Sequence, residues 1–384
     1  MSGPIDSLQI GMHWFGERQG GLDRMFMEIV DVLPSQGVNV RGLVAGSPAV
    51  EQASGGTIHS FATPQSPIGT RLRGVRSLAR RLKHAQMPDV VASHFALYAA
   101  PTAGLFRRVP HVVHFHGPWA DESFAEARRP LNQAVRRSLE RHVYRSGTRH
   151  IALSRAFGRL LIERYGVSEE RIRIVPGCVD VDRFDIGVSR REARERLGLP
   201  QDRPLIFCLR RLVWRMGLEN LIDAMFLVKR EMPDALLTIA GRGPLEPTLR
   251  AHAAARGLEN HVNLAGFVPD DMLPLWYAAA DLSVVPTVAL EGFGLTTIES
   301  LASGTPVLVT PVGGLPEAVA PLSPDLVLPA GGFHAIGAGI VDALREPGRL
   351  PDAQACRAYA RANFDRPVVA GQVAQVYREA IEAF

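Results

Sequence analysis

The sequence predicts an α/β protein built from two domains, each with a parallel β-sheet. The chain has 384 residues, more than one hydrophobic core usually holds. In both halves, short apolar segments alternate with helical segments, as they do in βαβ units. A clear example spans Leu282–Val309, where a strand, a glycine-rich loop, a helix and a second strand follow one another.

Composition favours a soluble globular protein. Hydrophobic residues make up 46% of the chain and charged residues 21%. No apolar run approaches the roughly 18–20 residues needed to span a bilayer, and no cleavable apolar core follows Asp6, so we expect a cytoplasmic protein. Cys178, Cys208 and Cys356 lack the spacing of a zinc site or a disulfide framework, and we interpret them as thiols in a reducing compartment.

Basic residues are concentrated in the first half of a chain whose formal net charge is +4. They cluster in Arg71–Lys83 and Arg128–Arg149, which we expect to be amphipathic helices with their arginines outward. Such a face is either simply solvated or docks on an anionic membrane surface, where each basic residue contributes about 1 kcal/mol. The arginines are not interleaved with aromatic residues, which argues against nucleic-acid binding.

In the first half, the pattern predicts strands joined by helices in a parallel sheet. Ser154 is expected to cap a helix over Arg155–Tyr165, and an earlier helix is expected over Leu22–Pro34. The expected strands are Leu8–His13, Val38–Val44, Val90–Ala92, His111–Phe115, Arg149–Leu153 and Arg171–Val175.

The loops that follow these strands carry the candidate binding residues, because ligands of open parallel sheets bind at the carboxyl ends of strands. Gly20 and Gly21 lack a Cβ, so backbone N–H groups there can approach a ligand closely. The loop does not match GxGxxG, which argues against a dinucleotide dehydrogenase. A tight Gly-Pro loop projects His116, whereas His114 is expected to be buried.

Three further loop residues could meet an acceptor. Trp14 lies after the first strand, and Trp119 and Asp121 lie beyond His116. Aromatic rings that line a cleft suit a sugar, although core packing explains them equally well.

In the second half, the loop around Glu291 predicts the ligand. Gly292, Phe293 and Gly294 precede a helix that begins near Leu295, and its N–H groups and dipole favour an anion such as pyrophosphate. A phosphate would repel Glu291 and Glu299, so these carboxylates are expected to accept hydrogen bonds from paired hydroxyls. The expected ligand thus has phosphates in the middle and a hydroxyl-rich group at each end, as a nucleotide sugar does.

The segment E-GFGLTTI-E followed by SGTPV resembles the E-x7-E signature of the retaining GT-B glycosyltransferases of family 4. The resemblance implies two facing, doubly wound Rossmann-like domains with a deep interdomain cleft. The expected domains are 1–185 and 186–365, with 366–384 crossing back to the first. It also implies that Glu291 faces the donor sugar, that Glu299 holds the ribose and that His116 contacts the transferred sugar.

Further loops resemble the family's donor contacts. Gln19–Leu22 is similar to its N-terminal glycine loop. Arg210–Leu218 is similar to the family's G-R-L-x-x-x-K-G loop, whose arginine and lysine bind the donor diphosphate. Arg211 stands at the position of the arginine, and Met216 replaces the lysine. The neighbouring Arg215 is expected to supply the second positive charge. Nucleotide contacts are implied for Gly241 and Gly243 of the G-x-G-P turn and for Phe267.

The expected reaction is retaining transfer from a UDP- or GDP-linked sugar to a glycan, lipid-linked or small-molecule acceptor. Glu291, His116 and Arg211 are the expected catalytic residues, without metal or cofactor, since arginines and a helix N-terminus supply the positive field. Asp180 and Asp182 form a DxD in a segment that resembles the family's linker between the two domains, and we do not interpret them as a metal site. A nucleotide-sugar epimerase or a non-catalytic nucleotide-sugar-binding protein of the same fold remains the alternative.

Overall fold

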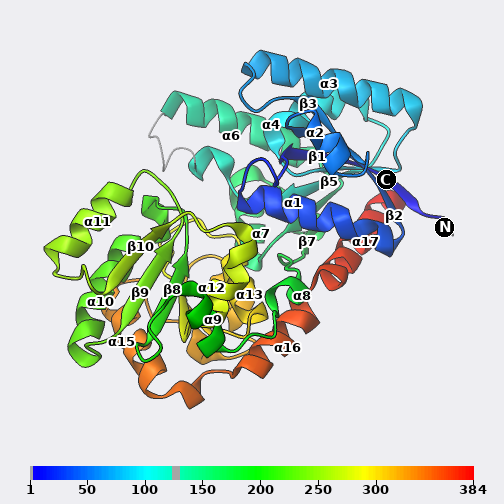
Figure 1. The fold of residues 1–384 in the computed structure, drawn as a ribbon. Helices are drawn as coiled ribbons and strands as arrows, with labels where there is room; N and C mark the ends of the chain where they lie inside the picture. Colours follow the sequence, from blue (N-terminus) through cyan, green and yellow to red (C-terminus); the bar gives the residue numbers. More distant parts are fainter. Residues whose placement is uncertain (1–2, 123–129) are drawn as a thin grey trace. The chain divides into compact units, whose positions relative to one another are not determined.

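The computed structural model describes residues 3–122 and 130–384 and divides the chain into two units. One unit comprises Met1–Cys178 together with Arg366–Phe384, and the other comprises Val179–Asp365. Each unit contains one sheet in which every pair of neighbouring strands is parallel (Figure 1). The predicted class of two parallel α/β domains is confirmed.

The first unit has a seven-stranded sheet in the order β3-β2-β1-β4-β5-β6-β7. The chain runs outward from β1 to β3, then returns to β4 on the other side of β1, so the winding direction reverses between β1 and β4. The strands are β1 (Ile5–His13), β2 (Val38–Ala45), β3 (Ile58–Ala62), β4 (Val90–Ser93), β5 (His111–Phe115), β6 (Arg149–Ala152) and β7 (Ile172–Ile174).

Its helices pack on this sheet and bury its apolar residues. Leu8, Ile10 and Leu43 of the central strands lie in one core cluster with residues of α3. Ser154 caps α7 as predicted, since its Oγ accepts from the backbone N–H of Phe157. The helices are α1 (Gly21–Val32), α2 (Ala49–Ala53), α3 (Ile68–Ala85), α4 (Ala96–Ala99), α6 (Pro130–Arg145), α7 (Arg155–Leu160) and α17 (Arg366–Glu382).

The C-terminal helix α17 belongs to the first unit, where it packs against α1 and against β4, β5 and β6. Tyr377 is fully buried there, and Arg366 pairs with Glu28 of α1 at 3.2 Å. A segment more than 180 residues away in sequence thus completes the core of this unit.

The second unit has a five-stranded sheet in the order β10-β9-β8-β11-β12, and its winding reverses between β8 and β11. The strands are β8 (Leu205–Leu209), β9 (Leu236–Ala240), β10 (Val262–Gly266), β11 (Leu282–Val285) and β12 (Val307–Val309). The helices are α8 (Val181–Phe184), α9 (Arg190–Leu197), α10 (Leu218–Glu231), α11 (Glu246–Ala255), α12 (Leu273–Ala279), α13 (Leu295–Ala302), α14 (Leu315–Val319), α15 (Phe333–Arg345) and α16 (Ala353–Phe364).

The second unit begins at Val179, several residues before the boundary expected at Asp185. The reason is α8, which packs against α12, α13 and α16. Val181 has no exposed surface, and the ring of Phe184 lies 6.1 Å from that of Tyr277. This short helix is therefore part of the second core.

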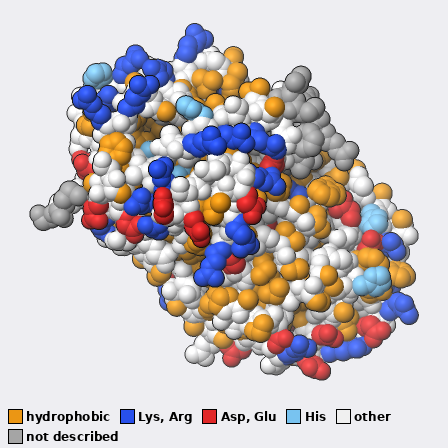
Figure 2. Space-filling view, turned by 180° about the vertical axis from the view of Figure 1, so that it is seen from behind, with side chains coloured by type: hydrophobic (Ala, Val, Ile, Leu, Met, Phe, Trp, Pro, Cys, Tyr) orange, Lys and Arg blue, Asp and Glu red, His pale blue; other side chains and the backbone are white. Residues whose placement is uncertain are grey.

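Helix α3 has the amphipathic pattern predicted for Arg71–Lys83. Val75, Leu78 and Ala79 are buried, whereas Arg73, Arg80 and Arg81 are exposed. Figure 2 shows Lys and Arg side chains gathered at the upper edge of the face that it draws, where α3 lies. Of the second predicted basic helix, α6 covers Pro130–Arg145, while Arg128 and Arg129 lie outside the described residues. Within the described part of the chain, no helix is both long and apolar enough to cross a membrane.

Candidate active site

The predicted site residues fall into two groups, one in each unit, and most of them lie in loops that follow the carboxyl ends of strands. In the second unit, one loop follows β8 and another follows β11. In the first unit, the loops follow β1 and β5. These are the places where open α/β sheets bind ligands.

An ion pair between Arg210 and Glu291 joins the two loops of the second unit. Nη2 of Arg210 lies 3.1 Å from Oε2 of Glu291; the side chain of Arg210 is buried, with an exposure of 7%, and that of Glu291 is partly buried, with an exposure of 13%. Thr287 donates to the same carboxylate oxygen through Oγ1 at 3.3 Å. Neither Nη2 nor Nε of Arg210 makes an aligned hydrogen bond to another described residue. The guanidinium of Arg210 therefore carries buried N–H groups that have no aligned hydrogen-bond partner among the described residues.

Arg210, rather than the predicted Arg211, has the buried arginine side chain at this loop. Successive residues at the end of a strand point to opposite sides, so these two neighbours cannot face the same way. The side chain of Arg211 is exposed, whereas that of Arg210 faces Glu291. Arg210 was not predicted as a site residue because the motif that this loop resembles has glycine at its position.

Arg215, which is expected to supply the charge of the missing lysine, lies next to the same loop and is also buried. Its Nη1 donates to the carbonyl oxygen of Leu290 at 3.1 Å. Among the described non-glycine residues, Leu290 alone has a positive φ, of 56°. This conformation costs about 1 kcal/mol or more for a residue with a Cβ and is typical of functional loops. Arg215 thus holds a strained backbone directly before Glu291.

Two glycines allow neighbouring loops to contact this segment. A Cβ on Gly313 would lie 1.9 Å from the carbonyl oxygen of Glu291, and one on Gly217 would lie 2.0 Å from that of Pro286. Both glycines have positive φ, of 58° and 69°. The predicted Gly241 and Gly243 play a similar part, since a Cβ on either would meet the backbone of Arg210 or Leu212.

We expect Gly313→Ala to destabilise the second unit by about 2 kcal/mol or more, because the added methyl group would overlap a carbonyl oxygen in a backbone conformation that alanine disfavours. Urea unfolding measures the effect. Gly348→Ala is the matched control, since a Cβ there would meet no atom within 4 Å. Equal urea midpoints for the two variants would contradict this expectation, because the loop after β12 would then have accommodated the added methyl group without cost.

The helix that follows this loop, α13, begins after Gly294, which has no side chain to cap it. Gly292 and Phe293 are buried, and the ring of Phe293 packs 5.4 Å from Phe364, so only its backbone can face a ligand. The uncapped first turn of the helix, starting at Leu295, leaves N–H groups for an anion.

Glu299 is buried within α13, with an exposure of 3%. The hydroxyl of Tyr277 donates to its Oε2 at 3.1 Å, which orients the carboxylate. At the end of β10, Phe267 is 43% exposed, and the guanidinium of Arg242 lies 4.9 Å above its ring. An exposed ring of this kind offers a stacking surface for a planar base.

In the first unit, Gly20 and Gly21 begin α1 at the end of the loop after β1. The carboxylate of Asp23 accepts from the backbone N–H of His13 at 3.0 Å and ties α1 to the strand end. Trp14, predicted to contact an acceptor, is 8% exposed and packs into the unit.

His116 follows β5 and lies beside two buried histidines, His94 and His114. His114 is buried, as predicted. Burial lowers the pKa of His116 to about 4 and places the pKa of His94 and His114 well below the usual value. All three rings are therefore neutral at pH 7.

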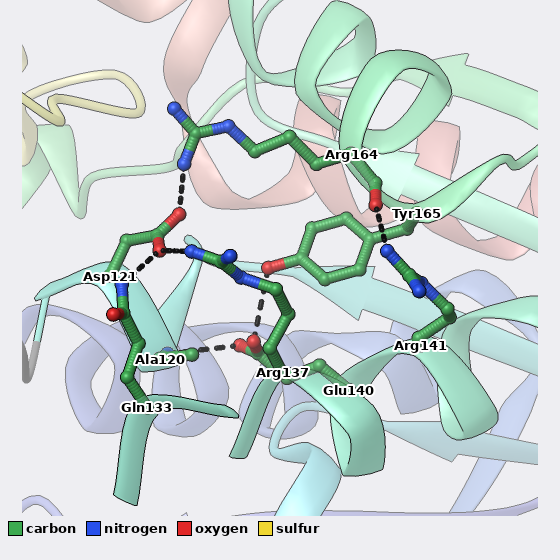
Figure 3. A network of polar contacts seen from close by, with 8 residues as sticks. All are labelled: Ala120, Asp121, Gln133, Arg137, Glu140, Arg141, Arg164 and Tyr165. Carbon is green, nitrogen blue, oxygen red and sulfur yellow. Dashed lines mark hydrogen bonds and ion pairs between the residues drawn. The ribbon is translucent and has the colours of Figure 1, made fainter. Parts of the chain in front are cut away.

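The carboxylate of Asp121 is fully engaged within the first unit (Figure 3). Its Oδ1 accepts from Gln133 at 3.0 Å and from Arg137, and its Oδ2 pairs with Arg164. Nearby, the guanidinium of Arg136 lies 4.7 Å above the ring of Trp119. An acceptor that used Asp121 would have to displace these partners.

Glu140 lies beneath this network with no exposed surface and accepts from the hydroxyl of Tyr165 at 3.0 Å (Figure 3). Burial raises its pKa from 4.5 to about 7. The folded protein thus keeps a proton here that the unfolded chain releases above pH 4.5, so the free energy of unfolding falls as pH rises from about 4.5 to 7.

We expect Glu140→Gln to remove this pH dependence and to raise the free energy of unfolding at pH 8 by about 3 kcal/mol. Urea unfolding at pH 5 and pH 8 measures it. Glu163→Gln, an exposed carboxyl in the same unit, serves as the control. A pH dependence that is the same in wild type and Glu140→Gln would contradict the expectation.

Comparison with known proteins places the chain among glycosyltransferases. The family model described as "Glycosyl transferases group 1" matches residues 189–363, and the one described as "Glycosyltransferase Family 4" matches residues 19–183. A D-inositol 3-phosphate glycosyltransferase of Thermobispora bispora is 31% identical over 77% of this chain and 71% of its own length. A GDP-mannose-dependent alpha-(1-6)-phosphatidylinositol monomannoside mannosyltransferase of Mycolicibacterium smegmatis is 36% identical over 48% of this chain. That match spans half of the mannosyltransferase's length.

Solved structures share the fold. Sucrose-phosphate synthase from Thermosynechococcus elongatus superposes with a TM-score of 0.82 at 20% identity, covering 99% of this chain and all of that one. An Anabaena protein, HepE, solved in complex with UDP-glucose, has a TM-score of 0.78 at 21% identity, covering 98% of this chain and all of that one. These likenesses confirm the predicted GT-B fold class.

Proposed function

Because the chain belongs to the group 1 glycosyl transferases of glycosyltransferase family 4, we propose that it transfers a sugar from a nucleotide-diphosphate sugar to a hydroxyl-bearing acceptor, with retention at the anomeric carbon. The observation that carries this proposal is the cluster of Arg210, Arg215 and Glu291 at the ends of β8 and β11. Two buried arginines there adjoin a helix N-terminus and a carboxylate.

The cluster suits a donor whose diphosphate becomes a leaving group. As the glycosidic bond breaks, negative charge grows on the diphosphate, and fixed positive groups in a buried site stabilise that charge. Arg210, Arg215 and the first N–H groups of α13 provide such groups, and we assign Arg211 a contact from the exposed side of the loop. This set of donors supports a reaction without a metal ion.

The two carboxylates bind the hydroxyl-bearing ends of the same donor. Glu291, held by Arg210, accepts from hydroxyls of the sugar, and Glu299, oriented by Tyr277, accepts from the ribose. Phe267 stacks on the base. The backbone of Gly20 and Gly21 approaches the phosphates, and His116 contacts a hydroxyl of the transferred sugar.

The nucleotide and sugar are proposed to be UDP- or GDP-linked. Named relatives use GDP-mannose, and a structural neighbour was solved with UDP-glucose. A panel of UDP- and GDP-sugars, assayed for release of the nucleoside diphosphate, identifies the donor, because slow hydrolysis requires no acceptor. Turnover of one donor in excess EDTA supports the proposal. Binding without turnover for every donor would contradict it, and activity that EDTA abolishes and manganese restores would contradict the metal-free reaction.

The acceptor is proposed to be presented at an anionic membrane surface, where Arg73, Arg80 and Arg81 of α3 make peripheral contact. Sedimentation with vesicles of neutral lipid and of lipid with an anionic component tests this contact. Binding only to anionic vesicles, weakened by salt, supports it. Equal and negligible binding to both vesicles would leave α3 a solvated face.

A further inference from the structure

His116 ends a chain of hydrogen bonds that starts deep in the first unit. Its Nε2 lies 3.1 Å from Nδ1 of His94, and Nε2 of His94 lies 3.1 Å from Oε1 of Gln9. Gln9 has no exposed surface and lies within β1, while His94 directly follows β4. Since β1, β4 and β5 are neighbours in the sheet, three adjacent strands each contribute one member of the chain.

Ser7 sets the direction of these hydrogen bonds. Its hydroxyl donates at 2.9 Å to the carbonyl oxygen of Asn39, which can only accept. Oγ of Ser7 is therefore an acceptor for the side-chain amide of Gln9, whose Nε2 lies 3.0 Å away. With Nε2 turned to Ser7, the amide of Gln9 presents Oε1 to His94.

The direction propagates to His116 without ambiguity. An amide oxygen only accepts, so Nε2 of His94 must carry a proton. His94 is neutral because burial lowers its pKa, and its Nδ1 consequently holds a lone pair. That lone pair accepts from Nε2–H of His116. Since His116 is also neutral at pH 7, its own lone pair lies on Nδ1.

The C-terminal helix joins the same network. The hydroxyl of Tyr377 lies 3.2 Å from Oε1 of Gln9 and 2.9 Å from Nε2 of His114. With Oε1 as acceptor, this hydroxyl donates to Gln9 and accepts from His114. The orientation of Gln9 thus satisfies two buried donors at once.

The three histidines could also be read as metal ligands, since one nitrogen of each lies within 4.8 Å of the others. Two observations argue for hydrogen bonding instead. The rings of His94 and His114 stack with centroids 4.1 Å apart and planes 20° apart, whereas an ion bound by imidazole lies in the plane of each ring. Both nitrogens of His94 are already engaged by Gln9 and His116.

We propose that Ser7, Gln9 and His94 are positioning residues that hold His116 in the tautomer protonated on Nε2, so that His116 meets its substrate as a hydrogen-bond acceptor through Nδ1. The identity of that substrate group, a sugar hydroxyl, rests on the proposed function. His116 then orients a hydroxyl by accepting a hydrogen bond from it, and it does not protonate the departing diphosphate.

Nuclear magnetic resonance of the full chain with ¹⁵N-labelled histidine tests this proposal directly, because a lone-pair nitrogen and an N–H nitrogen of imidazole have well separated shifts. The His116 signals are assigned by their loss in His116→Gln. In wild type at pH 7, we expect a lone pair on Nδ1 and a proton on Nε2. A proton on Nδ1, or equal population of both tautomers, would overturn the proposal.

Ser7→Ala tests the remote control of the tautomer. Without the Ser7 hydroxyl, the Gln9 amide loses the acceptor that fixes its orientation, and the His116 signals should become those of a mixture of tautomers. Ser93→Ala is the matched control, since Ser93 is a buried serine whose hydroxyl lies 2.7 Å from Nε2 of His111, outside the chain. An unchanged His116 tautomer in Ser7→Ala would refute the role of Ser7.

Donor turnover separates this inference from the proposed function. Substrate is expected to bind both tautomers equally and to turn over only when His116 is protonated on Nε2. If half of the Ser7→Ala molecules hold the wrong tautomer, kcat then falls about twofold while KM stays near the wild-type value, and Ser93→Ala retains wild-type kcat. The expected tautomer in a protein that turns over no nucleotide sugar would defeat the proposed function alone. Turnover of a nucleotide sugar by a protein whose His116 is protonated on Nδ1 would contradict the tautomer proposal alone.

Discussion

Glu291→Gln is expected to lower kcat/KM for donor turnover by about 100- to 1,000-fold. The amide cannot provide the charged acceptor that a sugar hydroxyl meets in the transition state, and losses of this size follow removal of one such charged contact. The change also leaves the buried guanidinium of Arg210 without its counter-charge. Steady-state release of nucleoside diphosphate measures the effect.

The control for this variant is Glu231→Gln. Glu231 also pairs with an arginine, Arg345, but about half of its side chain is exposed and it lies at the end of α10. Its loss should change turnover less than twofold, because exposed ion pairs contribute little. Comparable losses in the two variants would show that Glu291 has no special part in turnover.

Arg215→Ala is expected to reduce kcat by about 1,000-fold, more than Arg211→Ala. Arg215 is buried beside the loop of Glu291 and supplies charge to the leaving diphosphate, whereas the side chain of Arg211 is exposed. Arg215 also donates to the carbonyl of the strained Leu290, so its removal should lower stability as well.

A second substitution separates the two effects of Arg215→Ala. Glycine adopts positive φ without strain, so Leu290→Gly added to Arg215→Ala should recover part of the lost stability. It should not recover kcat, because the charge is still absent. Full recovery of kcat in the double variant would show that Arg215 acts only by holding the loop.

Much of the fold follows from local pattern. The strands over Leu205–Leu209, Leu236–Ala240 and Leu282–Val285 coincide with mostly apolar segments, because a strand covered on both faces needs a nearly continuous apolar run. The strand over Ile58–Ala62 was not predicted. It lies at the edge of the sheet, where most of its residues are half-exposed and the apolar signal is diluted.

The candidate site was predictable in its position and less so in its side chains. The E-x7-E segment and the glycine loop indicate which strand ends matter. The direction in which the side chain of Arg210 points depends on the residue at which β8 ends, and a shift of that end by one residue would reverse the direction. The partners of Asp121 come from α6 and from Arg164, more than 40 residues further along the chain, so no local pattern could show that this carboxylate is engaged.

Gln9 illustrates the same limit. Apart from Ser7 in the same strand, the partners of Gln9 are His94, which directly follows β4, and Tyr377 of α17 at the far end of the chain, so no local pattern could show them. A buried polar side chain in a strand requires hydrogen-bond partners, and that requirement is the one signal that could have marked Gln9.

The most direct test of the donor site is a crystal structure of the protein with the nucleoside diphosphate of its preferred donor. We expect diphosphate oxygens within hydrogen-bonding distance of Arg215, Arg210 or both, and of the first backbone N–H groups of α13, with Glu299 on the ribose hydroxyls. A diphosphate bound away from the ends of β8 and β11, or a ribose that does not reach Glu299, would contradict it.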